Sequence, residues 1–312
     1  MSTKTTLRDS AAMRWLVLLL LSFAMFCSYI FMDILSPIKD LLETTRGWDS
    51  VAFGTYSGAE PFLNVFIFFL IIAGIILDRM GVRFTAVLSG VVMLVGAVIN
   101  WYAVTEAFMG SSLEAWFNNN LNYIPIFDEL GVSPFYKGMP ASAKFAAIGF
   151  MIFGSGVEMA GITVSRGIVK WFRGREMALA MGAEMALARL GVTTCMIFSP
   201  VFAHMGPKPD VSRSVAFGVV LLMIALMMFI VYFFIDRKLD AQTGEAEEKD
   251  DPFRIRDLGK ILTSSGFWLV ALLCVLYYSA IFPFQKYAVN MLQCNLTFEE
   301  VAKGSIWGSS WI

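Results

Sequence analysis

Apolar runs of membrane-spanning length divide the sequence and constrain its fold more than any other feature. A run of about 20 apolar residues can cross the hydrocarbon core of a bilayer as a helix. Inside that core every backbone polar group must be hydrogen-bonded within the protein, which a helix achieves by itself. The predicted helices cover residues 15–35, 55–77, a third segment ending near 103, 143–169, 177–202, 215–235 and 261–284.

The composition supports the same interpretation. Hydrophobic residues make up 57% of the chain and charged residues 16%, and the mean hydropathy is +0.67. A soluble domain carries about 25% charged residues. The sequence therefore predicts an all-α polytopic membrane protein whose main surroundings are a lipid bilayer.

Charged stretches between the runs indicate how the chain is organised. Residues 1–238 are predicted to form an N-terminal six-helix transmembrane bundle, and the charged stretch 239–259 a cytoplasmic linker. Residues 260–312 are predicted to begin a C-terminal bundle, with a seventh helix and the start of an eighth, so we expect the chain to be part of a longer protein. The predicted inner turns carry most of the lysines and arginines, which places the N-terminus in the cytoplasm.

One external connection is unusually long. Residues 105–140 are polar but retain several aromatic side chains, which is atypical of disordered segments. We expect this external segment to pack on the membrane surface or to form a lid over the cavity mouth.

Two ionisable residues lie deep inside predicted helices. Glu158 precedes Lys170 by 12 residues and Arg189 follows Arg175 by 14 residues, so they lie roughly 18 and 21 Å into the bilayer. A charge facing lipid at this depth would be costly, and such residues are functional candidates. We expect them to face each other or a shared polar cavity. The alternative is a structural ion pair.

Acidic residues nearer the helix ends are expected to lie at the membrane surface and not in a substrate site. Asp33, close to Pro37, is predicted to lie at the membrane interface, and Glu60 at the headgroup-level start of its helix beside Pro61 and Asn64. Each of these carboxyl groups could take up a proton if it were desolvated. Uniport and proton symport therefore both remain open.

The turn after the second predicted helix carries a recognisable pattern. Its residues are Gly74, Asp78, Arg79, Gly81 and Arg83, between two apolar helices. Gly81 permits a tight turn, and the arginines favour the cytoplasmic side. The pattern resembles the signature between the second and third helices of the major facilitator superfamily. The resemblance implies that superfamily's fold and assigns these five residues to its conformational motif.

Three further stretches resemble the branch of that superfamily that contains a lysosomal dipeptide uniporter. They are residues 153–158, residues 171–176 followed by 188–191, and Tyr277-Tyr278 followed by Phe282-Pro283-Phe284. The resemblance implies that Glu158 and Arg189 hold the two charged ends of a dipeptide, with Tyr277 and Tyr278 also in the substrate site. The N-terminus lacks an acidic dileucine sorting signal, so a bacterial inner membrane is expected rather than a lysosomal membrane.

The predicted function is transport of a small solute by alternating access, most specifically of a dipeptide or similar zwitterion. A permease for organic anions held mainly by Arg189 and a non-transporting membrane sensor or scaffold are the alternatives. The sequence has no GxSxG, HExxH or Walker motif, which disfavours an enzyme or a nucleotide-driven pump. It indicates no cofactor, no metal site and no nucleic-acid partner. Protons are possible partners, and the oligomeric state is left open.

Overall fold

The computed structural model describes residues 6–243, 259 and 262–295, and it contains no strand among them. The chain divides into two compact units, Met1–Glu247 and Glu248–Ile312. In the first unit the longer helices are α1 (Ala11–Met32), α5 (Phe69–Ala103), α8 (Ala141–Trp171), α9 (Met177–Ala203) and α10 (Val211–Thr243). The shorter elements are η1 (Leu7–Asp9), η2 (Ser36–Ile38), α2 (Lys39–Arg46), α3 (Ser50–Ala59), α4 (Phe62–Phe66), α6 (Ser112–Asn119) and α7 (Pro125–Glu129). The predicted all-α membrane fold is confirmed.

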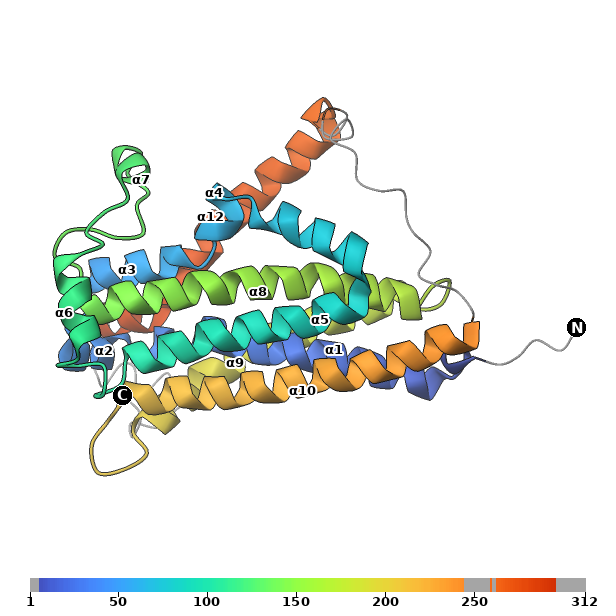
Figure 1. Cartoon of the computed structure of the whole chain (residues 1–312), viewed down its shortest axis with the longest axis horizontal. Helices are drawn as coiled ribbons and strands as arrows, with labels where there is room; N and C mark the ends of the chain where they lie inside the picture. Colours follow the sequence, from blue (N-terminus) through green and yellow to red (C-terminus); the bar gives the residue numbers. More distant parts are fainter. Residues whose placement is uncertain (1–5, 244–258, 260–261, 296–312) are drawn as a thin grey trace, which may run out of the picture. The chain divides into compact units, whose positions relative to one another are not determined.

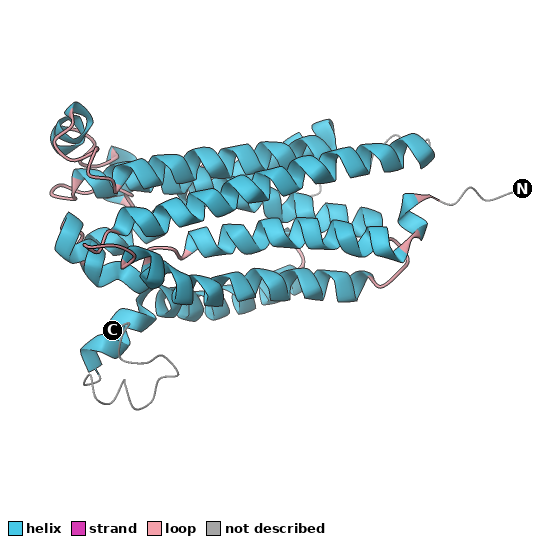
Figure 2. Ribbon diagram, turned by 90° about the horizontal axis from the view of Figure 1, so that it is seen from below, coloured by secondary structure: helices cyan, strands magenta, loops and turns pink. Residues whose placement is uncertain are grey.

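Six helical stretches among the described residues are long and apolar enough to cross a membrane. They are Ala11–Arg46, Phe69–Ala103, Ala141–Trp171, Met177–Ala203, Val211–Gln242 and Ser265–Leu292. The long helices of the first unit lie side by side (Figure 2), with connections at their two ends. Figure 1 shows that α1 and α9 run in one direction and α8 in the other.

The second predicted helix, residues 55–77, was wrong as a continuous element. It is divided into α3, α4 and the first part of α5 (Figure 1), with breaks at Glu60–Pro61 and at Ile67–Phe68. Pro61 has no backbone N–H to donate within a helix. Phe68 has φ 56°, a left-handed conformation that is unfavourable for a bulky side chain. The rest of the run is helical and merges with the third predicted helix across Gly81, where φ is 81°.

Small residues bring the helices of the first unit close together. At Gly96 of α5, an added Cβ would clash with the backbone of Gly149 and Phe153 in α8. At Gly156 of α8, it would lie 2.7 Å from the backbone nitrogen of Met93. Close backbone approach is how membrane helices gain packing energy, since lipid is as apolar as their side chains. The α5–α8 pair is therefore a principal contact of the unit.

Two boundaries differ from the sequence prediction. Helix α10 continues to Thr243, so residues 239–243 of the predicted linker are helical; the linker residues 244–258 lie outside the described part. In the second unit, α12 (Ser265–Asn295) starts and ends later than the predicted 261–284 and contains Pro283. The predicted start of an eighth helix also lies outside the described residues.

The predicted external segment, residues 105–140, packs on the C-terminal end of α5 and the N-terminal end of α8. Phe108 and Phe117 are buried with Ala141, and Tyr102 and Phe145 lie against them. A second contact joins α7 to α4, where the ring of Phe127 lies 4.8 Å from that of Phe62 and 5.3 Å from that of Phe66. The segment therefore combines packing on the bundle end with an aromatic contact to the broken second helix.

Candidate functional site

Arg189 lies against α1. Its guanidinium carbon is 5.5 Å from the centre of the Tyr29 ring, within the range of a cation–π contact. Gly191, two residues later, allows this approach because a Cβ there would lie 2.5 Å from the carbonyl oxygen of Phe26. Arg189 is therefore held beside the Phe26–Tyr29 turn of α1.

Glu158 of α8 reaches a similar level along α1. The rings of Phe31 and Phe153 lie 4.7 Å apart and fix the register between α1 and α8, which run in opposite directions (Figure 1). Glu158 follows Phe153 by five residues, a rise of about 7.5 Å. That rise brings it to the level of Phe26, close to the level of Arg189.

The two charged groups are separate in this structure. Within the described part of the chain, no ion pair joins Glu158 to Arg189. Glu158 is exposed, although its neighbours Val157 and Met159 are buried. The two opposite charges therefore lie at similar levels on helices that both pack against α1.

The acidic residues nearer the outer end are less exposed than the sequence indicates. Asp33 caps α1, as expected from its position near Pro37, but it is only 4% exposed. Nearby, the hydroxyl of the buried Tyr56 accepts a 2.7 Å hydrogen bond from Asn100. Tertiary packing therefore buries Asp33, which a position at a helix end alone would leave at the interface.

The residues of the conformational motif lie around the kink at Gly81. Asp78 accepts a 2.6 Å hydrogen bond from Arg166 of α8. Gly74 has open space around it, and Arg79 is exposed. Arg83 pairs instead with α10, its NH2 group lying 3.2 Å from Asp240.

Asp236 is the centre of the polar contacts at this end, a role that the sequence did not reveal. Its buried carboxylate accepts hydrogen bonds from Lys170 Nζ and Trp171 Nε1, both at 2.7 Å, and lies 3.8 Å from Arg83 Nε. Lys170 also lies 2.9 Å from Asp240. We call Arg83, Lys170, Asp236 and Asp240 the inner network; it joins α5, α8 and α10.

The N-terminal segment is tied to the same end. The backbone N–H and the hydroxyl of Thr6 each donate a 2.9 Å hydrogen bond to Asp9, which also lies 3.0 Å from Arg175. These contacts, chiefly those from Thr6, hold the pKa of Asp9 below its usual value.

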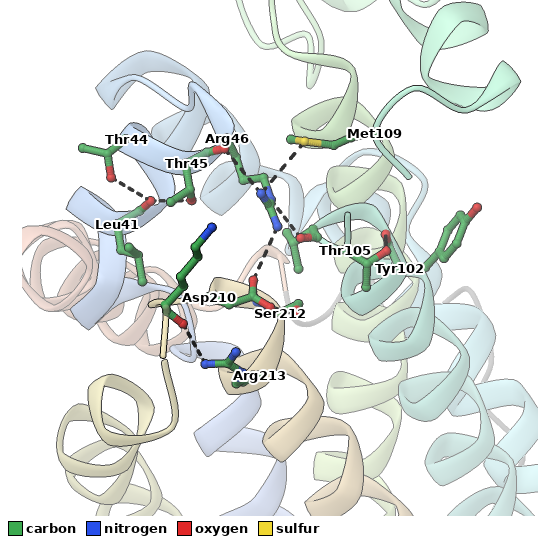
Figure 3. A network of polar contacts seen from close by, with 12 residues as sticks. Leu41, Thr44, Thr45, Arg46, Tyr102, Thr105, Met109, Asp210, Ser212 and Arg213 are labelled. Atoms are coloured by element: carbon green, nitrogen blue, oxygen red, sulfur yellow. Dashed lines mark hydrogen bonds and ion pairs between the residues drawn. The ribbon is translucent and has the colours of Figure 1, made fainter. Parts of the chain in front are cut away.

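A second network joins the opposite ends of the helices (Figure 3). Arg46 of α2 donates to the carbonyl oxygen of Val104 at 2.9 Å and lies 3.4 Å from Asp210, just before α10. Asp210 in turn accepts from the backbone of Ser212 at 3.0 Å. Polar contacts therefore fix both ends of the first unit and leave Glu158 and Arg189 between them.

Tyr277 and Tyr278 belong to α12 of the second unit. Their rings meet edge to face at 5.2 Å, and Tyr278 stacks on Phe282 at 5.0 Å. Tyr277 is 57% exposed and Tyr278 is 36% exposed. Neither side chain is buried.

The apolar helices and the charged residues between them indicate the class of protein. Long apolar helices, polar networks at the helix ends and opposite charges between those ends are typical of a multi-pass membrane transporter. The family model of the Major Facilitator Superfamily matches residues 21–302. The chain belongs to this superfamily, and the predicted resemblance is confirmed.

The curated proteins to which this chain is similar share one description. The "Lysosomal dipeptide transporter MFSD1" of Danio rerio is 24% identical over 282 residues, which cover 87% of this chain and 52% of the relative. The Gallus gallus protein of that name is 27% identical over 190 residues, 58% of this chain and 41% of the relative. The Bos taurus protein is 28% identical over 151 residues, 44% and 31% respectively. The chain thus spans about half the length of these relatives or less. No solved structure gives a significant match.

Proposed function

We propose that this transporter carries a small zwitterion, most specifically a dipeptide, by alternating access between two six-helix halves. Arg189 binds the carboxylate of the substrate, and Glu158 binds its ammonium group. The observation that carries this assignment is that the two residues reach similar levels along α1, on the helices α8 and α9 that both pack on it, without a direct ion pair between them in the described structure. The description of the relatives as dipeptide transporters supports the substrate class.

The surroundings of Arg189 suit the binding of a carboxylate. A guanidinium stacked on an aromatic face keeps its N–H donors directed outward in the ring plane. Those donors form a two-pronged fork that matches the geometry of a carboxylate, and such pairs are stronger than neutral hydrogen bonds. Tyr29 therefore positions the guanidinium and leaves its fork to the substrate.

The networks at the two ends of the first unit support movement of that unit as one body. Alternating access in secondary transporters is largely the rocking of one bundle against the other around a central site. The inner network and the Arg46 contacts join four helices across both ends. In this proposal the inner network and the N-terminus face the cytoplasm. Tyr277 and Tyr278 remain candidate substrate-binding residues, as the family resemblance implies. The bacterial inner membrane stays our prediction for its location.

The test is uptake by the purified protein in proteoliposomes. Arg189→Lys keeps the charge but loses the fork, so uptake of dipeptides should fall strongly. Glu158→Gln should impair substrates that have a free amino terminus and spare N-acetylated ones. Uptake of carboxylates without an amine that equals dipeptide uptake, and that Glu158→Gln leaves unchanged, would favour the organic-anion permease instead.

A sensor or scaffold with a structural ion pair predicts a different pattern. Each single variant would then leave one charge unpaired, at a cost of roughly 3 to 5 kcal/mol, and would lower the folded yield. Replacing both residues with apolar ones would restore that yield. We expect the double variant to fold but not to transport; restored uptake in it would exclude the substrate role.

A further inference from the structure

The amide of Asn64 in α4 has no partner where one is expected. Both its Nδ2 and its Oδ1 are buried, and neither makes a hydrogen bond within the described part of the chain. Burying a polar group without a partner costs about 1 to 3 kcal/mol. An apolar residue here would avoid that cost. The presence of an amide is explained if a ligand supplies its missing hydrogen-bond partners.

The register of the broken second helix places Asn64 beside Glu158. Helices α3 and α8 begin at the same end of the bundle and run in the same direction (Figure 1), and α4 follows α3 in the chain. At their closest approach, Glu60 Oε1 lies 2.8 Å from the position that a Cβ on Gly154 would take. Four residues further along, each of the two helices has advanced by about one turn, or 6 Å, and its side chain again points to nearly the same face. Those residues are Asn64 and Glu158.

The break in the helix keeps this register. From Glu60 to Ile67 the backbone stays in the right-handed helical region, with φ −54° at Glu60 and −79° at Pro61. The direction of the Asn64 side chain therefore follows from that of Glu60, one turn before it. Helix α4 packs on α8 along this stretch.

We propose that Asn64 is a specificity-determining residue that binds the first carbonyl group of the substrate. The inference rests on the proposed function, in which Glu158 holds the ammonium group. In a dipeptide that ammonium is separated from the peptide carbonyl by one carbon atom. The Asn64 Nδ2 group donates to this carbonyl oxygen, and Oδ1 accepts from the ammonium. The site thereby selects zwitterions that carry a carbonyl group at this position, dipeptides among them, over zwitterions of equal length that lack it.

Three compounds of equal length separate these contacts. Glycylglycine, 5-aminolevulinate and 5-aminopentanoate each have four chain atoms between the ammonium nitrogen and the carboxyl carbon. The first has a peptide group, the second keeps only its carbonyl, and the third has neither. Each is tested as a competitor of labelled glycylglycine uptake in proteoliposomes.

For the unchanged protein we expect glycylglycine and 5-aminolevulinate to compete about tenfold or more better than 5-aminopentanoate, because the site leaves a buried donor unpaired with the latter. In Asn64→Leu the three compounds should compete equally well, because glycylglycine and 5-aminolevulinate bind more weakly while the affinity for 5-aminopentanoate is unchanged. The thermal midpoint of the variant should stay equal or rise, since an unpaired amide is removed. Ser57→Ala is the matched control: it removes another buried, unpartnered polar group two turns outward on the same face, and should leave the preference intact.

The outcomes distinguish this inference from the proposed function. A preference that persists in Asn64→Leu, with glycylglycine still transported, would overturn the role of Asn64 alone. An unchanged protein that takes up none of the three compounds would overturn both. If Asn64→Leu does not fold, the smaller Asn64→Ala variant replaces it; failure of both to fold would show that the amide is structural and would also overturn the inference.

Discussion

The ammonium group of Lys144 lies 3.0 Å from the carbonyl oxygen of Phe117, and the two residues come from different parts of the outer end. Lys144 belongs to the first turn of α8 and is only 1% exposed. It donates also to Asn120 O at 3.3 Å and Asn122 Oδ1 at 3.0 Å. Phe117 and Asn120 lie at the C-terminal end of α6, where carbonyl groups are unpaired and a cation is favourable. No carboxylate pairs with Lys144 within residues 6–243.

We therefore expect Lys144→Met to loosen the external segment without unfolding the bundle. Hydrogen bonds to a charged donor contribute about 1.5 to 3 kcal/mol, and this variant loses them. Hydrogen exchange should increase over residues 111–122 and remain unchanged in α5 and α10. Lys137→Met, an exposed lysine of the same segment, is the control and should have no effect. Equal exchange in both variants would contradict the anchoring role of Lys144.

Two glycines of α8 should respond in opposite ways to the same substitution. A Cβ on Gly154 would meet the backbone and carboxylate of Glu60, whereas a Cβ on Gly161 would have nothing within 4 Å. Gly154→Ala should destabilise the purified protein by about 1 to 3 kcal/mol through overpacking. Gly161→Ala should stabilise it by up to about 1 kcal/mol, because alanine favours the helix. Thermal unfolding in detergent measures both; a stable Gly154→Ala protein would mean that α3 and α8 can separate freely.

Asp236 should be the most sensitive carboxylate of the inner network. It is fully buried, and Asp236→Asn would leave Lys170 and Arg83 with only Asp240 as a charged partner there. Breaking a buried pair costs about 3 to 5 kcal/mol, and the remaining Asp240 should reduce that loss. Asp240→Asn, whose side chain is 14% exposed, should cost less. The folded yield and the thermal midpoint measure how strongly each variant is destabilised. A larger loss in Asp240→Asn than in Asp236→Asn would contradict the central position of Asp236.

The proposed topology places Ser111 outside and Thr243 in the cytoplasm. Ser111 caps α6 in the external segment, and Thr243 ends α10. In a protein without its native cysteines, a cysteine at position 111 should react with an impermeant reagent in intact cells, and one at 243 should react only after lysis. Labelling of both positions in intact cells would rule this topology out.

Local rules allowed much of this protein to be predicted from the sequence. A bilayer forces apolar runs of this length to be helical, and a helix rises by a fixed amount per residue. The positions of the long helices and the similar depths of Glu158 and Arg189 follow from those two facts alone. The turn at Gly81 was also predictable, since a tight turn between two apolar helices needs a residue that tolerates positive φ.

Contacts between helices distant in sequence required the tertiary structure. Residues 65–77 are all apolar or glycine, so their pattern did not reveal the break that the backbone adopts at Phe68. Tyr29 is one aromatic residue among many in α1, and only the position of α9 shows that Arg189 stacks on it. The same holds for Asp236, at a predicted helix end, and for Asn64, whose relation to Glu158 follows from the contact between Glu60 and Gly154. The depth of a residue in the membrane depends only on its position along its own helix, so the sequence determines it. Which groups its side chain contacts depends on the helix packed against it, so only the tertiary structure determines them.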